Sequence, residues 1–211
     1  MVKSGLLSLT AVFGLLLAAH AHGFAAGYFL DKPGAFSTDV GMFNKWTGML
    51  KRQAKHVRSL PDRCGDSKYK DCDHQQLEEL TESLRNEPER QQIEDVNTYM
   101  NAHPYIIDQV NWGMEDYWEI PHEFENANGD CEDYAISKYM ALRELGVSAN
   151  DMQIVILQDL NLGGIIHAIL AVKYDDDYLI LDNQIKSTMP AKKIYHYRPI
   201  YALNETGWWR Y

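Results

Sequence analysis

The feature of the sequence that most limits its fold is a change of hydrophobic periodicity at Gly146. Before it, apolar residues recur at helical spacing in residues 39–57, in residues 75–86 and in a segment that runs from Pro88 to His103. After it, the runs MQIVIL, IIHAILAVKY, YLIL and KKIYHYRPIYALN are short, β-prone and separated by turn residues. Helices followed by antiparallel strands predict an α+β domain with a helical N-terminal half.

The residues between these halves have a different composition. The stretch YIIDQVNWGMEDYWEI, which starts at Tyr105, is aromatic and predicts extended structure, and PHEFENANGD reads as a polar loop. This loop ends where a further helix, Cys131 to Leu145, is predicted to begin. Gly146 is the predicted left-handed cap of that helix.

The first residues form a targeting signal. Lys3 supplies a positive charge, residues 6–19 form an uncharged apolar run, and Ala19-His20-Ala21 has the small residues that a signal peptidase reads. A bilayer-spanning helix needs about 20 apolar residues, and this run is shorter. We therefore expect a signal peptide over residues 1–21 that is removed on export, and a single domain over residues 22–211. An uncleaved anchor is the alternative.

Charge and cysteine content limit the functions that the chain can have. The formal charge of −10 and the lack of a basic stripe argue against nucleic-acid binding, which needs clustered lysine and arginine. Of three cysteines, Cys64 and Cys72 lie close together, and in an exported chain they form either a disulfide or a metal-binding pair. Cys131 is then a free thiol.

Cys131 lies in the motif NGDCEDY, where a polar loop enters the predicted helix. With Asp130 as N-cap, Cys131 falls in the first turn, where unpaired backbone N–H groups favour the thiolate. The backbone N–H of Cys131 also offers half of an oxyanion hole. A buried, inert thiol is the alternative, but these polar neighbours make a poor environment for a core residue.

A cysteine nucleophile needs a base and a group that orients the base. His167 lies in the predicted strand IIHAILAVKY, and Asp182 ends the next strand. A two-residue turn at Asp175-Asp176 would place Asp182 opposite Ile169, diagonal to His167 and on the same face. A three-residue turn would place Asp182 on the opposite face unless a bulge corrects the register.

Several other residues have open roles. His103 and His122 are rival bases. Trp112 lines a substrate groove, completes an oxyanion hole or belongs to the core, and the pair Trp208-Trp209 is expected to pack rather than bind.

The run NGDCEDYAISKYMALRELG, the histidine in an apolar strand and the segment LDNQ together resemble the bacterial transglutaminase-like cysteine proteinases. The resemblance implies a papain/transglutaminase-like fold and a Cys131–His167–Asp182 triad. It also implies a periplasmic endopeptidase that cleaves a large cell-surface adhesin near its N-terminus, at an alanine pair, and so releases biofilm cells. The implied regulator is an inner-membrane cyclic di-GMP receptor whose periplasmic domain sequesters the enzyme.

Calcium dependence is a further implication of the resemblance, and the residues add their own argument. Asp130, Glu132 and Asp133 surround Cys131 with carboxylates, which raise a thiol pKa unless a cation compensates them. Calcium binds six to eight oxygens, so these three are an incomplete set, and the resemblance adds Asn150 as a ligand. The alternative is that the acids only cap the helix.

Two other functions remain open at this stage. The same residues could transfer an acyl group to an amine, as in a transglutaminase or amidase. A non-catalytic, calcium-responsive module that docks to a membrane receptor is the alternative from another class.

Overall fold

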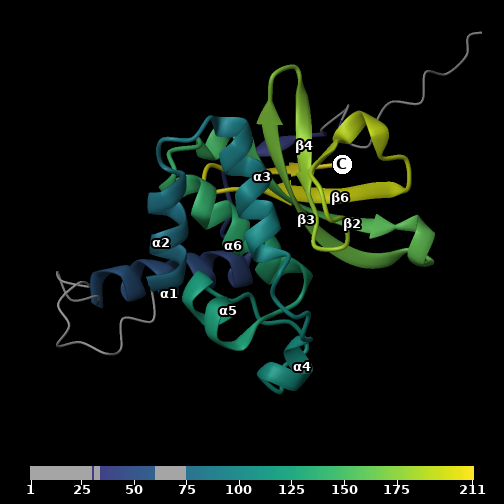
Figure 1. Cartoon of the computed structure of the whole chain (residues 1–211). Helices are drawn as coiled ribbons and strands as arrows, with labels where there is room; N and C mark the ends of the chain where they lie inside the picture. Colours follow the sequence, from purple (N-terminus) through teal and green to yellow (C-terminus); the bar gives the residue numbers. More distant parts are fainter. Residues whose placement is uncertain (1–29, 31–33, 60–74) are drawn as a thin grey trace, which may run out of the picture.

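The computed structural model describes residues 30, 34–59 and 75–211. The predicted signal peptide and the Cys64–Cys72 pair lie outside these residues. The described chain forms two layers, with helices gathered beside one face of a β-sheet (Figure 1). The α-helices are α1 Asn44–Ser59, α2 Gln75–Leu84, α3 Glu89–Met100, α4 Asp108–Asn111, α5 Pro121–Ala127 and α6 Cys131–Glu144. Among the described helices there is no membrane-spanning candidate, since none combines the required length and apolarity.

The sheet has the order β1-β7-β6-β2-β3-β4-β5, and every neighbouring pair is antiparallel. The strands are β1 Phe36–Ser37, β2 Met152–Asp159, β3 Ile165–Tyr174, β4 Asp177–Leu181, β5 Met189–Pro190, β6 Tyr197–Leu203 and β7 Trp208–Arg210. Three short 3-10 turns, Ala149–Asp151, Leu160–Leu162 and Ala191–Lys193, join some of them. The predicted α+β class is therefore confirmed.

Helix α6 is the centre of the packing between the two layers. Its buried Ala135, Tyr139 and Leu142 face the same core as Ala168 and Leu170 on β3. Every third or fourth residue of α6 thus meets every second residue of β3, as the two periodicities require. A second apolar cluster, which includes Ile169 and Ala171, covers the other face of the sheet.

The segment between residues 105 and 130 differs from the prediction. It holds α4 and α5 in place of extended structure and a polar loop. Pro121 occupies the first turn of α5, where its missing N–H is not needed, and the Glu123 carboxylate accepts a hydrogen bond from the Ile120 N–H at 2.9 Å. The apolar residues of this segment do not recur at helical spacing, so hydrophobic periodicity alone does not predict α5.

Other local predictions are confirmed or shifted slightly. Helix α1 begins at Asn44 rather than Asp39, because the Asp39 carboxylate accepts from the Gly41 N–H at 2.9 Å and closes a turn instead. Gly146 has φ of 98°, as expected for a left-handed helix cap. Trp208 and Trp209 pack, with ring centroids 5.3 Å from Phe43 and 5.0 Å from Phe36.

Candidate active site

Cys131 is the first residue of α6, with Asp130 as the N-cap. Asp130 N–H donates to Asp133 Oδ2 at 3.0 Å, which ties the loop to the first helical turn. Gly129 packs against that side chain, and a Cβ added to Gly129 would lie 2.7 Å from Asp133 Cβ. The Cys131 side chain is half-buried at the helix N-terminus, where it packs against the edge of the main apolar core and stays partly accessible.

His167 and Asp182 form a buried hydrogen-bonded pair. His167 Nε2 lies 3.0 Å from Asp182 Oδ1. Asp182 also accepts from the Gln184 N–H at 2.8 Å and from the Tyr197 hydroxyl. The pKa of Asp182 is lowered although burial opposes ionisation, because these hydrogen bonds and the His167 charge outweigh burial. Asp182 is therefore the ionised partner.

The β3–β4 turn decides this geometry. Tyr174 pairs with Asp177 and Leu170 with Leu181, so the loop contains only Asp175 and Asp176. This is the two-residue register, which puts His167 and Asp182 on one face. Asp175 has φ of 52°, a left-handed conformation that aspartate tolerates better than most residues.

Cys131 lies beside the same strand. The backbone N–H of Ala168, the residue after His167, hydrogen-bonds to the Cys131 sulfur. The thiol itself donates to Glu132 Oε2 at 3.2 Å, and in the described part of the chain no hydrogen bond joins it to His167. The sulfur is thus next to the His167–Asp182 pair, but its proton is directed to a carboxylate.

The acids around Cys131 belong to a larger carboxylate cluster that sequence reasoning missed in part. Three sets of groups each have ligand atoms within 4.8 Å of one another. The sets are Asp130, Cys131 and Glu132; Asp108, Asp116 and Glu132; and Asp108, Glu119 and Asp133. Asp108, Asp116 and Glu119 come from the segment expected to be extended, and only their acidic character in the sequence could have drawn attention to them.

Hydrogen bonds hold the added acids in place. Glu119 N–H donates to Asp133 Oδ1 at 2.8 Å, and Trp112 Nε1 donates to Glu119 Oε1. Trp112 is therefore neither a core residue nor an oxyanion donor in this structure, but a support for Glu119. Asp108 accepts from the Tyr117 N–H.

The cluster could hold a cation. Buried oxygens of three of its members, Asp108 Oδ1, Glu119 Oε2 and Asp130 Oδ1, have no hydrogen-bond partner among the described residues. Buried polar atoms are normally paired, and buried carboxylates in particular require a hydrogen bond, a counter-ion or a metal. The donor set is all carboxylate oxygen apart from the thiol, which suits a hard ion such as calcium.

The electrostatics agree with this conclusion. Burial, reinforced by neighbouring carboxylates, raises the pKa of Glu132 to about 9, that of Asp133 to about 10 and that of Glu119 to about 8. Burial and the Glu132 carboxylate also raise the pKa of the Cys131 thiol well above its usual value. When no cation offsets this repulsion, Glu119, Glu132, Asp133 and the Cys131 thiol therefore favour their neutral forms at pH 7.

Asn150, the fourth predicted ligand, is not at the cluster. It is exposed in the turn Ala149–Asp151, beyond the C-terminal end of α6, and its N–H donates to Ser148 Oγ at 3.2 Å. Cys131 is at the other end of this 14-residue helix, about 21 Å away along its axis. One ion cannot contact both ends, so Asn150 is not a ligand of an ion held by Asp130, Glu132 and Asp133.

The rival bases have other partners. His103 Nδ1 lies 3.3 Å from Asn128 Oδ1, and His103 Nε2 lies 3.6 Å from Glu125 Oε2. His122 stacks on His56 with ring centroids 4.4 Å apart. Their neighbours differ from those of His167, which lies on the strand that contacts the Cys131 sulfur.

Comparisons with known proteins identify a family and structures of similar fold. Residues 59–211 match the family model described as bacterial transglutaminase-like cysteine proteinase. The structure is similar to that of Legionella pneumophila LapG, with a TM-score of 0.60 and 29% sequence identity over 76% of this chain and 87% of that chain. The calcium-bound form of that protein gives the same values, and the EGTA-treated form matches over 77% and 85%. A comparison with curated protein sequences finds no match.

Proposed function

Since the chain belongs to the bacterial transglutaminase-like cysteine proteinase family and is a cysteine proteinase with a transglutaminase-like fold, we propose that it is a calcium-dependent endopeptidase with a Cys131–His167–Asp182 triad. The observation that carries this proposal is the buried His167–Asp182 pair, next to a half-buried thiol at a helix N-terminus. The structural likeness to a LapG protein supports it.

In the proposed reaction, the Cys131 sulfur attacks a peptide carbonyl carbon while His167 takes the thiol proton. Asp182 accepts from His167 Nε2, which leaves Nδ1 as the ring nitrogen that receives this proton. His167 returns the proton to the departing amine as the C–N bond breaks and a thioester remains. Water then attacks the thioester, and its proton passes through His167 back to the Cys131 sulfur. The oxyanion formed in each step lies next to the N–H of Cys131.

The carboxylate cluster supports the proposed calcium dependence. The Glu132 carboxylate accepts a hydrogen bond from the Cys131 thiol, which competes with transfer of the thiol proton to His167. Asp108, Glu119, Glu132 and their neighbours would hold the cation through their oxygens, and its positive charge would favour their ionised forms. We infer that Glu132, once it binds calcium, would no longer accept the hydrogen bond from the thiol, and that the positive charge would lower the free energy of the Cys131 thiolate. The calcium-bound and EGTA-treated LapG structures support this choice of ion.

The biological setting is also part of the proposal. We infer export to the periplasm, cleavage of a large surface adhesin near its N-terminus to release biofilm cells, and sequestration by the periplasmic domain of an inner-membrane cyclic di-GMP receptor. The likeness to LapG and the signal-peptide pattern of residues 1–21 support this setting.

The test is incubation of the purified mature chain with the exported N-terminal portion of a large adhesin, in calcium and in EGTA. We expect one major cleavage in calcium, little in EGTA, and none with Cys131→Ala in either. Cleavage that persists in EGTA would remove calcium from the mechanism, and cleavage by Cys131→Ala would remove the thiol.

A parallel assay with a labelled amine separates hydrolysis from acyl transfer. Amine incorporation that exceeds hydrolysis would assign the chain to transglutaminase chemistry. A Cys131→Ala variant that retains the full cellular phenotype would instead favour a binding module.

A further inference from the structure

Lys45 places a positive charge where the local structure disfavours one. It is the second residue of α1, and the first turn of that helix contains no acidic residue. The N-terminus of a helix carries a partial positive charge, so a lysine in the first turn is unfavourable by itself. A stabilising contact for Lys45 has to come from another part of the chain.

That contact is an ion pair with Asp116. The Lys45 ammonium contacts Asp116 Oδ2, and the two side chains are about half exposed, at 50% and 46%. Asp116 lies in the segment between α4 and α5, far from Lys45 in the sequence. The ion pair therefore joins the start of α1 to the segment that supplies Asp116 to the carboxylate cluster.

Asp116 is held close to the other acids of the cluster. One of its carboxylate oxygens lies within 4.8 Å of ligand atoms of both Asp108 and Glu132. Asp108 also accepts a hydrogen bond from the N–H of Tyr117, the residue after Asp116, which ties this part of the segment to the cluster. The buried Asp108 Oδ1 has no hydrogen-bond partner among the described residues, so an acceptor beside Asp116 is available to a cation.

Two cations therefore have a claim on the Asp116 carboxylate. One is the Lys45 ammonium, which contacts it in this structure. The other is an ion held by Asp108, Asp116 and Glu132, whose ligand atoms are close enough to share one. Two positive charges against the same carboxylate repel each other, so binding of the ion opposes the ion pair.

The surroundings of the ion pair allow the ammonium to leave. Lys45 and Asp116 both line a cavity of about 340 Å³, together with the aromatic residues Phe43, Trp118 and Tyr201. The lysine side chain is a flexible four-carbon stem, and space beside it is open. Exposed ion pairs contribute little free energy, so a divalent ion can replace the ammonium at small cost.

We propose that Lys45 is an internal counter-ion that calcium displaces from Asp116, so that this ion pair raises the calcium concentration at which the site fills. This inference rests on the proposed calcium dependence. Lys45 acts on the metal site through Asp116 and takes no part in the reaction. Removing the ammonium should strengthen calcium binding, because the ion no longer has to break the pair.

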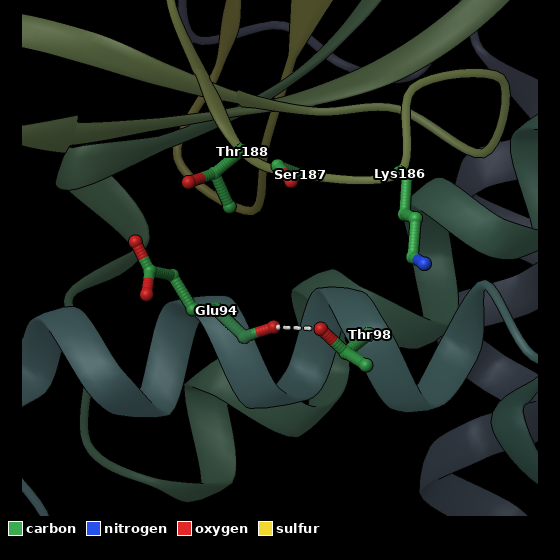
Figure 2. Close-up of a pocket in the computed structure, with 5 residues that line it drawn as sticks. All are labelled: Glu94, Thr98, Lys186, Ser187 and Thr188. Atoms are coloured by element: carbon green, nitrogen blue, oxygen red, sulfur yellow. Dashed lines mark hydrogen bonds between the residues drawn. The ribbon is translucent and has the colours of Figure 1, made fainter.

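The experiment measures the dissociation constant of calcium by calorimetry, in the full mature chain at low ionic strength. Lys45→Met is compared with Lys186→Met. Figure 2 shows Lys186 and Glu94 lining a separate cavity, of about 210 Å³, and Glu94 does not belong to the carboxylate cluster. We expect Lys45→Met to lower Kd by up to about fivefold, the upper range for an exposed ion pair, and Lys186→Met to change it less than about 1.5-fold. Lys45→Gln should act like Lys45→Met, and Lys45→Arg, which keeps the charge, should bind calcium like the wild type.

A double-mutant cycle with Asp116→Asn separates displacement from a general effect of charge. In the Asp116→Asn background the ion pair is absent, so Lys45→Met should have less than about half of its effect on log Kd. An undiminished effect would mean that the Lys45 charge acts on the ion through space, which would overturn the proposal. Urea unfolding gives a second readout, since calcium below saturation should raise the midpoint of Lys45→Met more than that of the wild type.

Two further outcomes overturn the proposal. One is an equal Kd in the wild type and Lys45→Met, which rejects the role of Lys45 and leaves the proposed function intact. The other is weaker binding by Lys45→Met, which would mean that Lys45 holds Asp116 in place for the ion. Absence of calcium binding by the wild type is a distinct result, because it rejects the proposed calcium dependence and the role of Lys45 with it.

Discussion

Replacing Glu119 by glutamine should stabilise the calcium-free protein at neutral pH. Glu119 is fully buried, and its Oε2 has no hydrogen-bond partner among the described residues. Burial raises its pKa to about 8, which the hydrogen bond from Trp112 opposes and the Asp108 charge reinforces. Glutamine has the same shape, and its carbonyl oxygen still accepts from Trp112 Nε1.

The sign and size of this change in the free energy of unfolding follow from proton linkage. Below pH 8 the folded protein keeps the Glu119 proton, whereas the unfolded chain releases it above the ordinary pKa of 4.5. The contribution of Glu119 to stability is therefore fully present below pH 4.5 and is lost as pH rises toward 8. At about 1.4 kcal/mol per pH unit, the loss at pH 7 is about 3 kcal/mol, and Glu119→Gln avoids it.

The assay is urea unfolding at about pH 5.5 and pH 7, in EGTA and in excess calcium. In EGTA, Glu119→Gln should gain about 3 kcal/mol at pH 7 and about 1 kcal/mol at pH 5.5. In calcium at about 1,000 times Kd the order should reverse at pH 7, because binding through the wild-type carboxylate would add about 4.1 kcal/mol, which exceeds the gain of about 3 kcal/mol in the variant. Glu87→Gln, at an exposed position, is the control. An equal shift at both pH values, or destabilisation in EGTA, would refute the reasoning.

Three further substitutions test the site and the core. Asp182→Asn should lower kcat by about 10⁴ with little change in KM, because the imidazole loses its orienting carboxylate, and steady-state kinetics on the adhesin segment would check this. Gly129→Ala should weaken calcium binding in calorimetry, since its Cβ would lie 2.7 Å from Asp133 Cβ, and an unchanged isotherm would contradict it. Trp46→Ala should cost about 3–5 kcal/mol in urea unfolding, because Trp46 is fully buried with its ring 5.6 Å from that of Tyr139. A loss of unfolding free energy below about 1 kcal/mol would contradict this prediction, because it would mean that neighbouring side chains fill the space left by Trp46.

Local sequence patterns were sufficient to predict the parts of the site in which neighbours in the sequence are also neighbours in space. The N-cap before Cys131 and the 3.6-residue period of α6 predict both the position of the thiol and the buried face that contains Tyr139. The two-residue alternation of β3 and β4, with a two-residue turn, predicts that His167 and Asp182 share a face. In each case one short segment contains all of the information, because helix and strand periods fix side-chain direction.

The complete carboxylate cluster could not be predicted in this way. Asp108 and Glu119 reach Asp133 only because α4 and the residues after it fold back against the start of α6, and no periodicity encodes that approach. The resemblance added Asn150 to the predicted ligands, but in the structure the length of α6 separates Asn150 from Cys131.

The amino-acid sequence by itself determined the α+β class, the helix that presents Cys131 and the hairpin that pairs His167 with Asp182, because these depend on local backbone periods and turn length. Only the tertiary structure decided which acids join Asp130 and Glu132 and where the thiol proton is directed. Those features depend on distances between segments that are far apart in the chain, and such distances are set by the packing of helices on the sheet.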